Sequence, residues 1–193
     1  MRCSRTRRQI SRLDSGRYIP KVRRGLTAEA ILPYTSGTMS NKRKIRELAL
    51  QLLFLWDTHG ERDEEMTQQA VRDGSSDITL RTRATELAGA AWEHRQISDA
   101  WIERLAPQWP PRRQPGVDRN LLRLAVWELT GTATPPKVVL DEAIELAKEY
   151  STEQSPAFIN GVLDAVLRER NTLMGVSGSS EINSNDETRN SNE

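Results

Sequence analysis

Four cations lie at the start of a helical pattern, at Lys42, Arg43, Lys44 and Arg46. The positive end of a helix macrodipole makes each exposed cation there unfavourable by about 0.3–1 kcal/mol. A bound polyanion reverses this preference, because phosphates are favoured both by the helix end and by the cationic side chains. The four residues are therefore candidates for RNA or DNA binding. The alternative is a solvated basic turn that binds nothing.

A second candidate contact with nucleic acid lies in 151-STEQSPAFINGVLDAVL-167. Ser155 and Pro156 fit the N-cap and first residue of a helix, whose first N–H groups are expected to be free. Gln154 precedes this helix start, and Phe158 lies two residues after the proline. A polar loop, a helix N-terminus and an aromatic ring together suit single-stranded nucleic acid. The alternative is a well-capped helix with Phe158 in the core.

Residues that could support catalysis or bind a metal are few. His59 and His94 have no second ligand one turn away, so we expect them to be solvated. Glu142, Glu145 and Glu149 alternate with an apolar stripe, which is typical of a charged outer helix face. We find no glycine-rich phosphate loop and no nucleophile elbow. The sequence predicts neither an enzyme nor a resident cofactor or metal.

The distribution of charge divides the chain into three parts. Residues 1–38 hold nine Lys/Arg against two Asp/Glu, and residues 171–193 hold one against four. We expect both tails to be disordered and residues 39–170 to form one folded domain. Met39 is an alternative start of the protein, and the basic segment also resembles an organelle transit peptide in composition. The single Cys3 excludes an intrachain disulfide and fits a reducing cytoplasm, and no apolar run approaches the roughly 18 residues of a membrane span.

The first helix carries one apolar stripe at helical spacing, from Ile45 to Trp56. Placing residues at 100° intervals puts Leu50 and Phe54 outside this stripe, with Phe54 nearly opposite its centre. A large aromatic side chain in that position requires a cover. Either another helix of the same domain or a partner protein can supply it.

The rest of the folded part also shows only helical periodicity. The predicted helices cover about 62–72, about 78–95, a short helix capped by Ser98 and ending at Leu105, one capped by Asp118 and ending near Gly131, one starting at Pro136, and one starting at Ser155. Several prolines in 107–116 separate the first group of helices from the second. The fold class is therefore all-α, with about three helices on each side of this divide.

Four segments together resemble the NusB family of transcription antitermination factors, over about residues 40–170. They are 43-RKIRELALQLLFLWD-57, 117-VDRNLLRLAVWEL-129, 135-PPKVVLDEAIELAKEY-150 and 153-EQSPAFINGVLD-164. The resemblance implies two packed three-helix bundles and no catalytic activity. It also implies binding to boxA RNA of ribosomal RNA leader transcripts together with NusE, a small-subunit ribosomal protein, in the RNA polymerase elongation complex with other Nus factors.

The resemblance also implies roles for particular residues. The arginine-rich motif of the family matches Lys42, Arg43, Lys44 and Arg46, its second RNA-contacting patch matches Gln154, Ser155 and Phe158, and its NusE-binding surface matches Phe54 and Asp118. Lysine replaces some of the family's arginines, which keeps charge but loses the forked hydrogen bonding of guanidinium. Many relatives have Asp where Gln154 stands, so this chain should repel phosphates less there.

Three alternative functions are compatible with parts of the sequence. The same helical domain occurs fused to RNA cytosine methyltransferases. That interpretation requires a downstream α/β domain with a cofactor-binding glycine loop, which we do not expect because residues 171–193 are predicted to be a disordered tail. A helical protein-interaction module with nonspecific RNA binding would also explain the basic turn. Finally, an exposed Phe54 surface could serve a homodimer instead of NusE.

Overall fold

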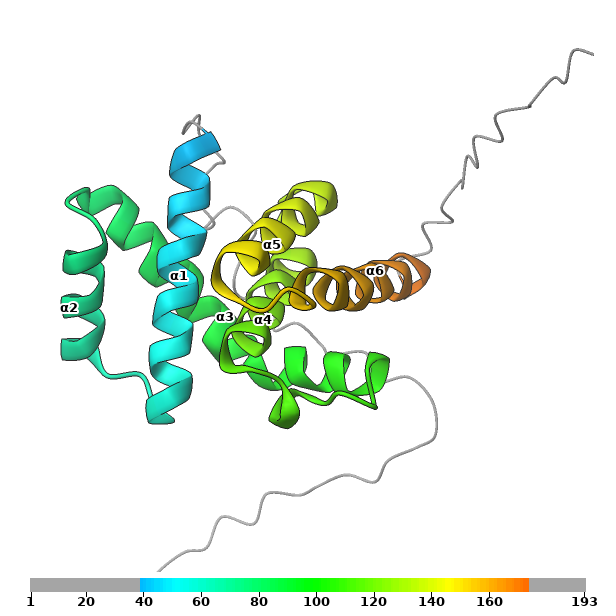
Figure 1. Cartoon of the computed structure of the whole chain (residues 1–193). Coiled ribbons are helices and arrows are strands. Elements are labelled where there is room, and N and C mark those ends of the chain that lie inside the picture. Colours follow the sequence, from blue (N-terminus) through cyan, green and yellow to red (C-terminus); the bar gives the residue numbers. More distant parts are fainter. Residues whose placement is uncertain (1–38, 174–193) are drawn as a thin grey trace, which may run out of the picture. The chain divides into compact units, whose positions relative to one another are not determined.

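The computed structural model of the protein describes residues 39–173, except for the side chains of Met39 and Ser40. Within this range the chain forms only helices (Figure 1). They are α1 (Met39–His59), α2 (Glu64–Gly74), α3 (Ile78–Leu105), the 3-10 helix η1 (Pro111–Arg113), α4 (Gly116–Gly131), α5 (Pro136–Tyr150) and α6 (Ser155–Leu173). The prediction of an all-α fold is confirmed. The tails predicted for 1–38 and 171–193 lie outside the described residues, apart from 171–173, which still belong to α6.

Local capping explains where the first helices start. Asp63 and Asp77 are the N-caps of α2 and α3, and their carboxylates accept bonds from Met66 N and Thr79 N, each over 2.8 Å. Between α1 and α2 the chain turns at Gly60, whose φ of 80° suits a residue without a side chain. Short polar side chains therefore begin α2 and α3.

Helix α3 runs without interruption through the predicted break at Ser98, so the prediction that Ser98 caps a separate short helix is wrong. The Ser98 side chain is fully buried, and its hydroxyl lies 3.1 Å from His94 Nδ1, one turn earlier. A hydroxyl that finds a partner on its own helix does not need to end that helix. As a result, α3 is long enough to contribute to both halves of the domain.

The first core lies among α1, α2 and α3 and consists of two clusters of buried apolar side chains. The predicted stripe of α1 is confirmed, because Leu48, Leu52 and Trp56 are each only 1% exposed. They face the small residues of α3, and Ala84 and Ala88 are fully buried there. Small side chains at a helix crossing let the two backbones approach closely. This core holds α1, α2 and α3 together as one bundle.

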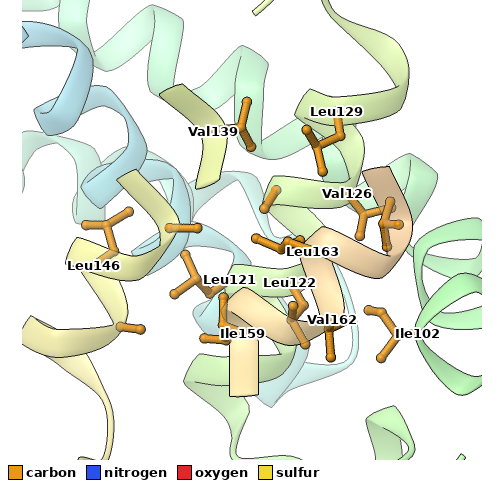
Figure 2. Packing of buried hydrophobic residues seen from close by; sticks show 14 of the residues in the cluster. Ile102, Leu121, Leu122, Val126, Leu129, Val139, Leu146, Ile159, Val162 and Leu163 are labelled. Atoms are coloured by element: carbon orange, nitrogen blue, oxygen red, sulfur yellow. The ribbon is translucent and has the colours of Figure 1, made fainter. Parts of the chain in front are cut away.

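The second core lies among α4, α5 and α6 (Figure 2). Its labelled side chains converge from these helices and from the end of α3: Ile102, Leu121, Leu122, Val126, Leu129, Val139, Leu146, Ile159, Val162 and Leu163. Leu50 of α1 also belongs to this core and is 4% exposed. The two predicted three-helix bundles are thus present, and α1 and α3 pack against α4 between them. Within the described range, no helix has both the length and the apolar character needed to cross a membrane.

Candidate nucleic-acid interface

The N-terminal part of α1 carries the cations singled out by the sequence. The helix begins at Met39, slightly before the predicted start, and its first turn contains no acidic residue. Arg43 Nη2 donates to Glu149 Oε2 over 2.8 Å, and Arg43 Nε lies 3.6 Å from Glu47 Oε1. Lys44 Nζ also contacts Glu47, over 3.0 Å. Lys42, Arg43 and Lys44 are all partly exposed, so their charges can be reached from solvent.

Arg46 does not share this surface. Its side chain is 7% exposed, and its Nε and Nη2 atoms donate to the two carboxylate oxygens of Glu128 over 2.9 and 2.8 Å. Glu128 lies on α4 and is itself buried. A forked, buried ion pair of this kind fixes α1 against α4. The structure therefore separates Arg46 from the accessible cations with which the sequence grouped it.

The last turn of α5, which leads into the loop before α6, contacts Arg43 of α1. Glu149, the partner of Arg43, is on the last turn of α5, and Gln154 follows it by five residues. Five residues span at most roughly 18 Å even when fully extended. The Arg43–Glu149 contact therefore keeps the second predicted segment within reach of the first, although 106 residues separate the two contacting side chains in the sequence.

The members of the second predicted patch differ in their accessibility. Gln154 is exposed, and Phe158 is partly buried because one side of its ring packs on the second core. Ser155 is only 2% exposed. The predicted free N–H groups at the start of α6 are not all available, since Ser155 N donates to Thr152 O over 3.0 Å and Pro156 has no N–H. Gln154 and the open side of Phe158 are the parts of this patch that a ligand can reach.

Asp118, predicted to belong to the NusE-binding surface, is hydrogen-bonded to Ser155 of the predicted RNA-contacting patch. It accepts bonds from Ser151 Oγ over 2.5 Å and from Ser155 Oγ over 2.8 Å, and it is 3% exposed. Because α4 begins at Gly116, Asp118 lies inside the helix and the prediction that it caps α4 is wrong. Its carboxylate instead holds the loop between α5 and α6 against the start of α4.

Phe54 is 44% exposed, as its position opposite the core stripe predicts. Part of its ring lies against Gly116, where an added Cβ would come within 2.8 Å of Phe54 Cε2. Gly116 lies two residues before Asp118 in α4. An exposed aromatic ring that rests on a glycine leaves its outer apolar surface available to a partner.

Asp57 is the centre of a network of hydrogen-bonded charges that the sequence analysis did not predict. Asp57 of α1 accepts bonds from Arg119 Nη2 over 2.5 Å, Arg123 Nη1 over 2.6 Å and Asn120 Nδ2 over 3.1 Å. Arg123 also donates to Asp99 of α3 over 2.8 and 2.7 Å. The spacing of Arg119 and Arg123 on one face of α4 was a signal, but only the fold identifies their partners.

The electrostatics of Asp57 follow from this geometry. Burial disfavours its charged form, but the hydrogen bonds from Arg119 and Arg123 outweigh burial and hold the pKa of Asp57 below its ordinary value of 3.8. The carboxylate is therefore charged at neutral pH and can anchor both guanidinium groups.

The two histidines occupy different environments. His59 is exposed, as predicted, whereas His94 packs against Trp127 with 5.1 Å between the ring centroids, so the prediction of a solvated His94 is wrong. Burial lowers the pKa of His94 below 6.5, which favours the neutral ring at pH 7. Across residues 41–173, no cluster of His, Cys, Asp and Glu side chains is suited to hold a metal ion.

Comparison with known proteins identifies the family. The family model of the NusB family matches residues 43–168. The transcription antitermination protein NusB of Solibacter usitatus is 42% identical over 133 residues, which is 68% of this chain and 91% of that protein.

Solved structures agree with this match. T. maritima NusB has a TM-score of 0.57 at 34% identity and covers 66% of this chain and 91% of its own. A structure of the antitermination factors NusB and NusE in complex with dsRNA has a TM-score of 0.61 at 29% identity, with 68% of this chain and 98% of that chain covered. The helical architecture, the family model and the sequence identity together show that this chain belongs to the NusB family of transcription antitermination proteins.

Proposed function

We propose that this protein binds boxA-type single-stranded RNA of ribosomal RNA leader transcripts together with NusE, and so helps RNA polymerase resist termination in a complex with other Nus factors. The family is one of transcription factors, and the protein is accordingly not an enzyme. Transcription would place it in the cytoplasm. One observation supports the RNA-binding proposal: the partly exposed Arg43 of α1 pairs with Glu149, five residues before the exposed Gln154.

The proposed RNA contacts divide into two chemical kinds. Lys42, Arg43 and Lys44 supply positive charge for phosphates, which carries no sequence information. Gln154 can hydrogen-bond a base or the backbone, and Phe158 can stack on an unpaired base. The buried Ser155 and Arg46 support these contacts from beneath, by holding the loop and α1 in place.

The proposed NusE surface centres on Phe54, with Gly116 beside it. A solved relative of this family forms a complex with NusE and dsRNA, which supports the choice of partner. Asp118 supports this surface from inside, since its buried carboxylate contacts Ser151 and Ser155. The same apolar face could form a homodimer, and measurement of molar mass in solution with and without NusE distinguishes the two partners.

The decisive experiment measures affinity of the full chain for a fluorescent boxA-like RNA, a scrambled RNA and a duplex RNA, with and without NusE, at two salt concentrations. Replacing Lys42 with alanine is expected to weaken binding to every RNA alike and to reduce the salt slope by about one. Replacing Phe158 with alanine should cost about 1–3 kcal/mol for boxA-like RNA, from lost stacking.

Preference for boxA-like RNA that tightens with NusE supports the proposal. Equal, salt-driven binding to all three RNAs would instead support the alternative of a helical interaction module with nonspecific RNA binding. If a Lys42→Ala/Arg43→Ala variant keeps full RNA affinity, the assignment of these cations to RNA binding is wrong.

Replacing Gly116 with alanine is expected to weaken NusE binding roughly fivefold, or by about 1 kcal/mol, because the new methyl group must displace the Phe54 ring. Calorimetric titration with NusE gives the affinity, and thermal unfolding checks the fold. Gly161→Ala in α6 is the matched control, since nothing lies within 4 Å of an added Cβ there. Equal NusE affinity of the two variants would contradict a binding surface at Phe54.

A further inference from the structure

The ion pair between Arg43 and Glu149 covers part of the proposed phosphate-binding site. Arg43 Nη2 and Glu149 Oε2 are 2.8 Å apart, and the two side chains are 32% and 48% exposed. Neither residue is needed to fill the core. The pair joins α1 to the end of α5 at the surface where RNA is proposed to bind.

Acidic side chains surround this arginine. Glu47 contacts both Arg43 and Lys44, and Glu142 and Glu149 both act electrostatically on Arg43. The hydrogen bond from Arg43 holds the pKa of Glu149 below its ordinary value of 4.5, so this carboxylate is charged at neutral pH. Arg43 and Lys44 therefore each have a carboxylate partner within the protein.

Carboxylate and phosphate oxygens make the same kind of bond with a guanidinium group, because both accept its planar N–H donors in parallel. An RNA phosphate that approaches Arg43 Nη2 must therefore compete with Glu149 for this donor. Since both side chains are solvated, this exchange requires no change in the helices.

We propose that Glu149 is an internal competitor for RNA phosphate at Arg43 and thereby sets the affinity of the cationic site. This inference rests on the proposed RNA-binding function. This competition weakens a contact with the RNA phosphates, which carries no information about the RNA sequence. Stable binding then depends more on Gln154, Phe158 and the partner protein.

The test compares Glu149→Gln with Glu145→Gln. Both glutamates lie on α5 and are 48% exposed, but Glu145 pairs with Lys148 over 2.6 Å instead of with Arg43. Each substitution removes one negative charge from nearly the same region. Affinity for the boxA-like RNA and for the scrambled RNA is measured for both variants and for the wild type, and again in an Arg43→Ala background.

Glu149→Gln is expected to bind both RNAs about two- to fivefold more tightly than the wild type. The expected gain is small because an exposed ion pair contributes little free energy. Glu145→Gln should change affinity less. In the Arg43→Ala background the gain from Glu149→Gln should disappear, because the competition acts through that arginine.

Three outcomes would overturn the inference. The first is an equal effect of the two glutamine variants, and the second is a gain in affinity that persists without Arg43. Either result would show that only the overall charge of the protein affects RNA affinity. The proposed function would still stand if Arg43→Ala weakens RNA binding. Absence of RNA binding by the wild type and by every variant would overturn both the inference and the proposed function.

Discussion

Replacing Arg46 with alanine is expected to lower the free energy of unfolding by about 3–5 kcal/mol. The substitution removes both hydrogen bonds to Glu128 and leaves that carboxylate 6% exposed in the interior without its cation. An unpaired buried charge costs far more than an exposed one, because water no longer solvates it. Urea unfolding followed by circular dichroism measures the loss.

The double variant Arg46→Met/Glu128→Leu separates stability from RNA contact. Two apolar side chains of similar size need no charge partner, so the double variant should recover most of the lost stability. Its RNA affinity should equal that of the wild type, because Arg46 lies beneath the proposed interface. If the double variant is stable but loses as much RNA affinity as Arg43→Ala, Arg46 contacts RNA directly and our assignment from burial is wrong.

Replacing Asp57 with asparagine is expected to cost about 3 kcal/mol of unfolding free energy, at the low end for buried pairs because its side chain is 14% exposed. Asparagine keeps the size of the side chain but leaves Arg119 without its carboxylate and Arg123 with only Asp99. Since Asp57 joins α1 to α4, and Arg123 reaches α3, the loss should affect both bundles together. A single cooperative unfolding transition at lower urea concentration would show this.

The contribution of Asp57 should also depend on pH. Its folded-state pKa is depressed below the ordinary 3.8, so its stabilising effect is complete above that value and is lost as the pH falls through the folded-state pKa. The difference in unfolding free energy between the wild type and Asp57→Asn should therefore be constant near neutral pH and shrink below pH 3.8. A difference that persists unchanged in acid would mean that shape, and not charge, is the source of the stabilisation.

Local patterns in the sequence predicted the helices and their inward faces, except that α3 continues through the predicted break at Ser98. Apolar residues at helical spacing identify the buried side of α1, and the same spacing places Phe54 outside it. Such features depend on neighbours in the chain, which is why the sequence alone reveals them.

The sequence by itself therefore determined the helical fold class, the resemblance to the family and the set of candidate residues. Only the tertiary structure decided which of those residues face solvent. Arg46 and Arg43 are three residues apart, yet one is buried against Glu128, 82 residues away, and the other meets Glu149, 106 residues away. The pairing of Asp118 with Ser155 likewise spans 37 residues. Charge partners at such separations depend on which helix faces meet, and helical periodicity specifies a face but not its neighbour.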